Sequence, residues 1–105
     1  MSVVQPVFRA LADKTRREIL LLLQGKEMTI AEVAENFDMT RAAVKKHLSV
    51  LSEGNLIRME RSGRQTICAS NPDGITPVID WLQVYDSFWD ARLAALKTAI
   101  EKDKS

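Results

Sequence analysis

The 105-residue sequence predicts a mainly α single domain, in which a pair of short helices is followed by a β-hairpin and a long last helix. Three observations support this fold class. Apolar residues recur at helical spacing in two adjacent segments between residues 29 and 53. Two strand-like segments flank a Ser-Gly pair within residues 56–70, and an apolar seven-residue repeat runs through residues 76–102.

The first helix of the pair begins with a capping box, in which Thr29 and Glu32 each satisfy a free backbone N–H. Its apolar residues fall on one helical face: Ile30, Val33, Ala34 and Phe37. Asp38 and Met39 form the turn, and Thr40 caps the second helix. The inward face of that second helix is Val44, Leu48 and Leu51.

The outward face of the second helix carries small and cationic residues, with Arg41 in its first turn. The other outward residues are Ala42, Lys45, Lys46 and Ser49. Such a face suits a helix inserted into the DNA major groove. An ordinary solvated helix face has the same composition, so this helix alone leaves both interpretations open.

Two further helices are predicted before the pair. Pro6–Ala12 is expected to form a short helix that turns Phe8, Leu11 and Ala12 inward. Asp13 caps a helix over Lys14–Gln24, which Gly25 ends. The apolar run from Ile19 to Leu23 predicts central burial of this helix. Arg16 and Arg17 lie in its first turn and oppose the helix dipole, so we expect a structural salt bridge, with backbone carbonyls or DNA phosphate as alternatives.

The hairpin is predicted from Leu56–Arg61 and Gln65–Ala69, with the turn at Ser62-Gly63. Its tip is polar and basic: Arg61, Arg64 and Gln65. Beside a DNA-binding helix, such a hairpin is a wing that contacts the neighbouring backbone or minor groove. An ordinary exposed turn is the alternative.

The last helix is expected to begin after Thr76, with Pro77 at its first position, and to end near Lys102. Its apolar surface is too broad for one small core to cover, which predicts a homodimer. The expected interface residues, with help from the first helix, are Phe8, Trp81, Leu82, Tyr85, Phe88, Trp89 and Leu96. An aromatic ligand pocket is the competing interpretation.

Charge is unevenly distributed along the chain. The net charge is +1 overall, −1 over residues 1–39, +4 over residues 40–65 and −2 over the remainder. The positive segment coincides with the second helix and the wing, as phosphate binding requires. No apolar run approaches the roughly 18 residues of a membrane span, and no signal pattern is present. A single cysteine fits a reducing compartment, so we expect a cytoplasmic protein.

The predicted order α-α-α-α-β-β-α is that of a winged helix-turn-helix with a long C-terminal dimerisation helix. FRALADKTRREILLLL followed by MTIAEVAENFDMTRAAVKKHLSVLSEGNLIRMERSGRQ resembles the ArsR/SmtB-type bacterial transcriptional repressors. The tail WLQVYDSFWDARLAAL is similar to their SdpR-like autorepressor branch. The resemblance covers about residues 6–102 and implies a homodimer that binds an inverted-repeat operator in double-stranded DNA.

The resemblance also assigns DNA-contacting positions on the second helix and the wing. These are Thr40, Arg41, Ala42, Lys45, Lys46, His47, Arg61 and Arg64. Family members commonly have Ser-Gln-Pro or Ser-Gln-Ser where this chain has Thr40-Arg41-Ala42, so the operator sequence is expected to differ. Arginine pairs bidentately with guanine O6 and N7, a preference that glutamine does not share.

Many members of this family respond to metals, but the ligands for such a site are scarce here. Thiolate sites need several cysteines, and interhelical sites need His with carboxylates. The chain has one cysteine, Cys68, and one histidine, His47, which packs at the core edge or touches phosphate. Asp86 and Asp90 are i,i+4 neighbours that bind a hard cation weakly at most. We therefore expect no metal and no cofactor.

Cys68 is expected to be a small buried hydrophobe on the second wing strand. A redox switch would need an exposed thiolate, with Arg58 or Arg61 beside it. Two other functions compete with repression. One is a winged-helix module that binds another protein, and the other is a regulator that responds to an anti-repressor protein or a small ligand. An enzyme is not expected, because no nucleophile triad, carboxylate pair or Gly-rich phosphate loop is present.

Overall fold

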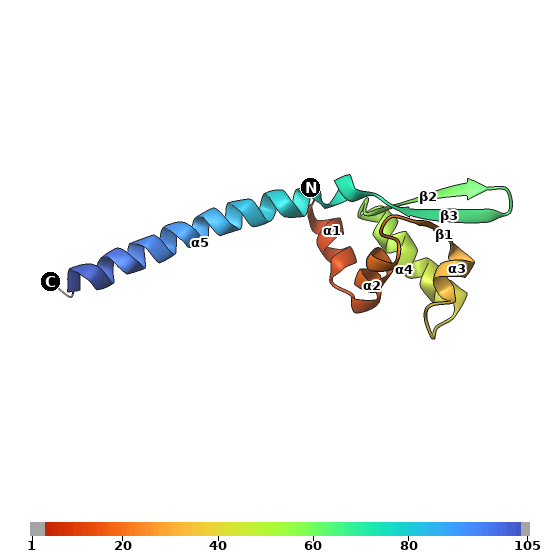
Figure 1. Ribbon diagram of the computed structural model, residues 1–105, viewed down its shortest axis with the longest axis horizontal. Coiled ribbons are helices and arrows are strands. Elements are labelled where there is room, and N and C mark those ends of the chain that lie inside the picture. The colour runs from red at the N-terminus through yellow and green to blue at the C-terminus, as the bar shows by residue number, and fades with distance from the viewer. Residues whose placement is uncertain (1–3, 104–105) are drawn as a thin grey trace.

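The computed structural model describes residues 4–103 (Figure 1). Its elements are α1 (Val4–Leu11), α2 (Lys14–Leu22), β1 (Glu27–Thr29), α3 (Ile30–Ala34), α4 (Arg41–Glu53), β2 (Ile57–Ser62), β3 (Gln65–Ser70), the 3₁₀ helix η1 (Pro72–Ile75) and α5 (Thr76–Asp103). The elements from α1 to η1 pack together and are called the winged domain below, whereas α5 projects away from them (Figure 1). The fold is the predicted winged helix-turn-helix.

The core joins all the helices of the winged domain to the sheet. Its fully buried apolar side chains include Ile19, Leu23, Val33, Val44, Leu48, Leu51 and Ile57. The predicted inward face of α4 is therefore confirmed. On α3 only Val33 of the predicted face is fully buried, Ile30 and Ala34 are partly buried, and Phe37 lies beyond the end of the helix. Within residues 4–103, no helix combines the length and the hydropathy that a membrane span requires.

The first two helices differ from the prediction in which side chains they bury. On α1 the buried residues are Val7 and Ala10, and the predicted inward residue Ala12 is exposed because the helix ends one residue before it. Asp13 caps α2 as predicted, accepting a hydrogen bond from the Arg16 N–H at 3.1 Å. The run on α2 is not buried all round, since Leu21 is 67% exposed.

The two arginines at the start of α2 bind backbone carbonyls, so the expected salt bridge is wrong. Arg16 donates to the carbonyls of Ala10 and Arg9, both at 2.9 Å, and Arg17 donates to the carbonyl of Leu11 at 2.7 Å. These are the last carbonyls of α1, which have no partner inside that helix. The arginines therefore cap α1 and compensate the negative end of its dipole.

The predicted caps of the helix pair are confirmed. Thr29 Oγ1 accepts from the Glu32 N–H at 3.1 Å, and the Glu32 carboxylate accepts from the Thr29 N–H at 3.0 Å. The pKa of Glu32 is lowered, because the backbone N–H and then the hydroxyl of Thr29 stabilise the carboxylate. Thr40 caps α4 by accepting from the Ala43 N–H at 3.1 Å. Asn55, at φ 61°, follows α4 in a left-handed conformation.

The sheet has three antiparallel strands in the order β1-β3-β2, and β1 was not predicted. The hairpin turn is Gly63-Arg64, one residue later than predicted, because Ser62 pairs with Gln65. Gly63 has a φ of 64°, which a glycine accepts at the first central position of a type II′ turn. This shift places Arg64 at the tip of the wing.

After the sheet, η1 turns the chain into α5. A Cβ atom on Gly74 would collide with the carbonyl of Asn55, so only glycine fits this crossing. Val78 is the only buried residue among the described side chains of α5, and it lies near α1. Beyond Val78 the large apolar side chains of α5 are exposed, so the winged domain does not cover the broad apolar surface of this helix.

Candidate nucleic-acid interface

A groove of about 450 Å³ lies between the N-terminal turns of α4 and the wing. Its lining joins segments that are distant in sequence: Thr29, Ile30, Ala31, Arg41, Ala42, Lys45, Arg61, Arg64, Gln65 and Thr66. Six of the nine residues predicted to contact DNA line it, namely Arg41, Ala42, Lys45, Arg61, Arg64 and Gln65. The fold thus gathers the predicted helix residues and the predicted wing residues on one surface.

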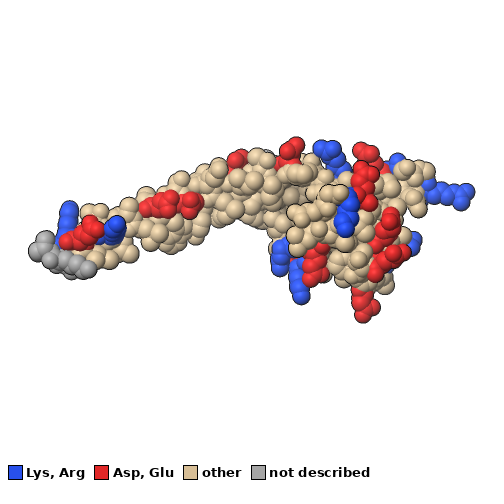
Figure 2. All heavy atoms as spheres, in the orientation of Figure 1, with Lys and Arg blue, Asp and Glu red and all other residues tan. Residues whose placement is uncertain are grey.

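The cations of this surface are exposed. Within residues 4–103, Arg41, Lys45 and Arg64 form no ion pair. Arg61 Nε donates to the carbonyl of Gly63 at 3.3 Å, which holds its guanidinium near the turn. Figure 2 shows Lys or Arg side chains extending from the end of the hairpin. The positive charge is available for a polyanion and is not consumed inside the protein.

The outward side of α4 is held in place by the buried, opposite face of the same helix. Val44, Leu48 and Leu51 are completely buried, and the helix packs on α1, α2 and α3. A helix anchored in this way presents its outward side chains in a fixed register, which base-specific contacts require.

Thr40, Lys46 and His47 lie outside the groove lining. Thr40 and Lys46 are exposed at the start and on the outward side of α4. His47 is directed toward α2 instead, with its Nδ1 atom 3.2 Å from an Arg16 guanidinium nitrogen and 3.8 Å from an Asp13 carboxylate oxygen. The Arg16 N–H bond, followed by the charges of Arg16 and His47, lowers the pKa of Asp13 against the opposing effect of burial. This cluster ties α4 to the α1–α2 corner.

A family model described as a helix-turn-helix domain matches residues 11–60. The transcriptional repressor SdpR of Bacillus subtilis is 34% identical over 76 residues, which cover 72% of this chain and 84% of the relative. The HTH-type transcriptional regulator Rv2034 of Mycobacterium tuberculosis is 29% identical over 96 residues, or 91% of this chain and 87% of the relative. The crystal structure of an ArsR family transcriptional regulator, RHA00566, is 34% identical and superposes with a TM-score of 0.78, covering 84% of this chain and 91% of that one. The chain belongs to the ArsR family of transcriptional repressors.

Solved structures agree with this membership. An ArsR-like transcriptional regulator from Rhodococcus sp. RHA1 superposes with a TM-score of 0.83 at 30% identity, covering 95% of this chain and 92% of that one. The chain is thus an SdpR-like ArsR-family regulator with a helix-turn-helix DNA-binding domain. In this ArsR-family fold, α4 is the recognition helix and the β2–β3 hairpin is the wing.

Sequence reasoning missed four residues that line the groove of this ArsR-family domain. They are Thr29, Ile30, Ala31 and Thr66. The first three belong to the start of α3, which the sequence predicts only as a capped helix with an inward face. The position of the capping box marked this helix start, but nothing local in the sequence indicated that it borders the wing.

Three of the predicted interface residues, Trp81, Tyr85 and Trp89, form a continuous row of ring contacts along α5, called the aromatic ladder below. The Trp81 and Tyr85 rings stack with centroids 5.0 Å apart, and Tyr85 meets Trp89 edge-on at 5.9 Å. Phe8 of α1 touches the ladder through Trp81, edge-on at 5.4 Å. Leu82, Phe88, Trp89 and Leu96 are each 45–58% exposed. The winged domain therefore leaves most of this apolar surface uncovered, because α5 projects away from it (Figure 1).

Cys68 is completely buried on β3, between Met28 and Met59 in the strand register. Burial raises the pKa of its thiol. A redox switch requires an exposed thiolate, so the structure contradicts the redox-switch hypothesis. Among residues 4–103, no three His, Cys, Asp or Glu side chains are placed to hold a metal ion together.

Proposed function

We propose that the protein is a homodimeric repressor that binds an inverted-repeat operator, including one in its own promoter, without a metal cofactor. The observation that carries the proposal is the groove in which the start of the recognition helix meets the tip of the wing. A phosphate backbone that follows the wing brings base edges of the major groove under α4.

Within this proposal the exposed side chains have two kinds of role. Arg41 and Lys45 contact base edges, and Ala42 permits close approach to a thymine methyl group. Arg61, Arg64 and Lys46 bind phosphate, with Thr40 and Gln65 as neutral donors to the same backbone. His47 acts as a positioning residue, because its Nδ1 atom lies against Arg16 on the far side of α4.

The proposed dimer rests on the exposed surface of α5. Ten large apolar side chains between Ile79 and Ile100 are each at least 43% exposed. Isolated exposed leucines are ordinary, but a continuous aromatic and aliphatic stripe of this length is typical of an interface between subunits. A two-fold axis that relates two copies of this helix provides the fixed spacing that two half-sites require.

We include autorepression in the proposal because the tail resembles the SdpR-like autorepressor branch of the family. The decisive experiment measures binding of the purified protein to a labelled fragment of its own promoter, by fluorescence anisotropy at two salt concentrations. We expect the promoter fragment to bind at least about 10³-fold tighter than a shuffled fragment of equal length. Equal affinity for both fragments would refute sequence-specific repression and leave only non-specific binding.

The dimer has its own test. Trp89→Ala combined with Leu96→Ala removes two exposed side chains beyond the part of α5 that meets the winged domain, so this domain is expected to remain folded. Truncating a buried interface aromatic typically costs at least ~2 kcal/mol of association. Sedimentation equilibrium is expected to show a wild-type dimer and a variant shifted to monomer. Thr98→Ala, which the helical spacing puts on the opposite side of α5, is the matched control and is expected to remain dimeric.

A further inference from the structure

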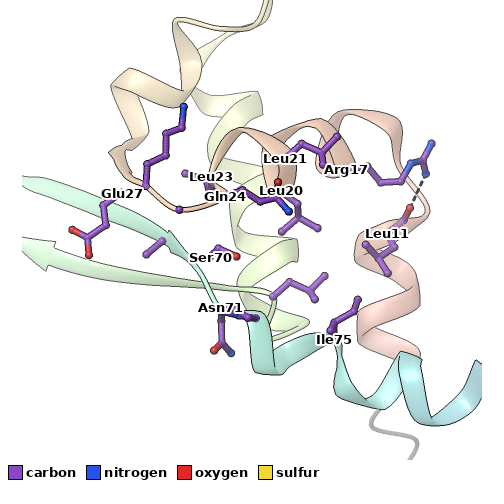
Figure 3. A pocket seen from close by; sticks show the side chains of 15 residues that line it. Leu11, Arg17, Leu20, Leu21, Leu23, Gln24, Glu27, Ser70, Asn71 and Ile75 are labelled. Atoms are coloured by element: carbon purple, nitrogen blue, oxygen red, sulfur yellow. Dashed lines mark hydrogen bonds between the residues drawn. The ribbon is translucent and has the colours of Figure 1, made fainter.

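A second cavity, remote from the DNA groove, opens between α2 and η1 and has a volume of about 800 Å³ (Figure 3). Its sides come from α1, α2, the start of β1, the end of β3 and η1. Six apolar side chains dominate the lining: Leu11, Leu20, Leu21, Leu23, Leu56 and Ile75. Pockets of about 300–1,000 Å³ with apolar walls and few polar groups are typical of small-molecule sites.

The lining also contains polar side chains, of which two are cationic (Arg17 and Lys26), one is acidic (Glu27) and three are neutral (Gln24, Ser70 and Asn71). Arg17 uses one guanidinium nitrogen to bind the carbonyl of Leu11 at 2.7 Å and keeps further N–H donors at the exposed edge. Lys26 also lines the cavity and forms no ion pair with any described residue. Glu27 is the one carboxylate in the lining, and it points away from Leu20 and Ile75 (Figure 3).

Leu21 extends the apolar lining to the open side of the cavity. It borders the cavity and is 67% exposed, although Ile19 and Leu23 of the same turn are completely buried. An apolar chain lying between Leu21 and Ile75 removes this leucine from water, while an acidic group at its end meets Arg17. The lining thus matches a molecule with an apolar body and a single negative charge.

The cavity also lies at the joint between the DNA-binding elements and α5. Asn71 lines it, and its side chain donates to the carbonyl of Asn55 behind α4 at 2.8 Å while accepting from Arg58 of β2 at 3.1 Å. Ile75 lines it as well and directly precedes α5. A ligand in this cavity would therefore contact Asn71, which is bonded to Asn55 and Arg58, and Ile75, which leads into α5.

We propose that this cavity binds a small amphipathic carboxylate, with its chain among the leucines and its head group at Arg17, and that occupancy weakens operator binding. The regulatory half of this inference rests on the proposed function. A ligand that favours one orientation of α5 and a DNA that favours another must oppose each other reciprocally.

Isothermal calorimetry without DNA tests the binding half, with decanoate, decanol and decylamine as probes of equal chain length. We expect decanoate to bind as one molecule per chain and decylamine to bind at least about tenfold more weakly, because two cations and only one carboxylate line the cavity. Arg17→Gln is expected to weaken decanoate binding about tenfold or more. Leu21→Asp, a substitution at an exposed position, is expected to weaken it by a similar factor. Lys14→Gln, an exposed cation of α2 that lies outside the cavity, is the control and is expected to bind normally.

Several results would overturn this assignment. Absence of decanoate binding refutes the site whatever the protein does with DNA, and equal binding of decylamine refutes the role of Arg17. Binding that disappears as protein concentration rises would mean that a second copy covers the cavity, which also refutes the ligand site.

The regulatory half is measured by anisotropy on the promoter fragment. We expect saturating decanoate to lower the affinity of the wild-type protein for the promoter fragment by at least about fivefold, and to leave the affinity of the Leu21→Asp variant unchanged. Bound decanoate without any change in DNA affinity refutes the regulation alone. Failure of the proposed function appears separately, as absence of promoter binding by the unliganded protein.

Discussion

Arg64 at the tip of the wing offers a quantitative test of how the groove binds DNA. The Gly63-Arg64 turn places this side chain at the outermost point of the hairpin, where it is exposed and pairs with no carboxylate in residues 4–103. A contact made there reaches the phosphate backbone and carries no base information. Arg64→Ala is therefore expected to lower the affinity for operator DNA and for random DNA by the same factor.

The magnitude follows from the two copies in a dimer. Each neutralised phosphate contributes about 0.9 to the slope of log affinity against log salt, so losing two contacts reduces the slope by about 1.8. Between about 50 and about 200 mM salt, the variant's affinity is then expected to fall about tenfold less than that of the wild type.

The assay is anisotropy over a salt series, with Lys14→Ala as a control that removes an exposed cation already paired with Glu18 on α2. An unchanged slope for Arg64→Ala, or a loss confined to the operator, would refute the assignment of the wing tip to phosphate.

Three further predictions concern other parts of the molecule. Arg41→Ala is expected to cost about 1–3 kcal/mol of binding free energy on the operator and to relax the base preference at one position per half-site. An equal loss of affinity for random DNA would contradict a base contact by Arg41. Excess zinc or chelator is expected to change operator affinity by less than about twofold, as anisotropy titrations check. Because the pKa of Asp13 is lowered by folding, its charge stabilises the protein above the usual value of 3.8 and this contribution disappears as the pH falls through the lowered value. The stability difference between wild type and Asp13→Asn in urea is therefore expected to narrow with acidification, and a constant difference would contradict the argument.

Local chemistry explains what the sequence predicted well. The caps at Asp13, Thr29 and Thr40 are formed by residues three positions from their donors, so the sequence alone contains the whole interaction. The inward face of α4 was likewise predicted from its spacing, and six of the nine residues predicted to contact DNA line the groove.

Long-range contacts explain what the sequence did not predict. The three-residue strand β1 exists only because β3 pairs with it from about forty positions away, and so short a segment carries no periodicity. Arg16 and Arg17 bind carbonyls of the preceding helix, which depends on how α1 and α2 meet. The exposure of Leu21 depends on the cavity beside η1, and no apolar pattern within α2 indicates it.

The central claim is that two recognition helices, held by α5, bind two half-sites of one operator. It is tested most directly by inserting ~5 base pairs, half a duplex turn, between the half-sites of the promoter repeat. We predict that binding of two chains to the intact repeat falls to the level of random DNA, because the half-sites then face opposite sides of the duplex. Undiminished binding to the lengthened repeat, or one chain per intact repeat, would contradict the claim.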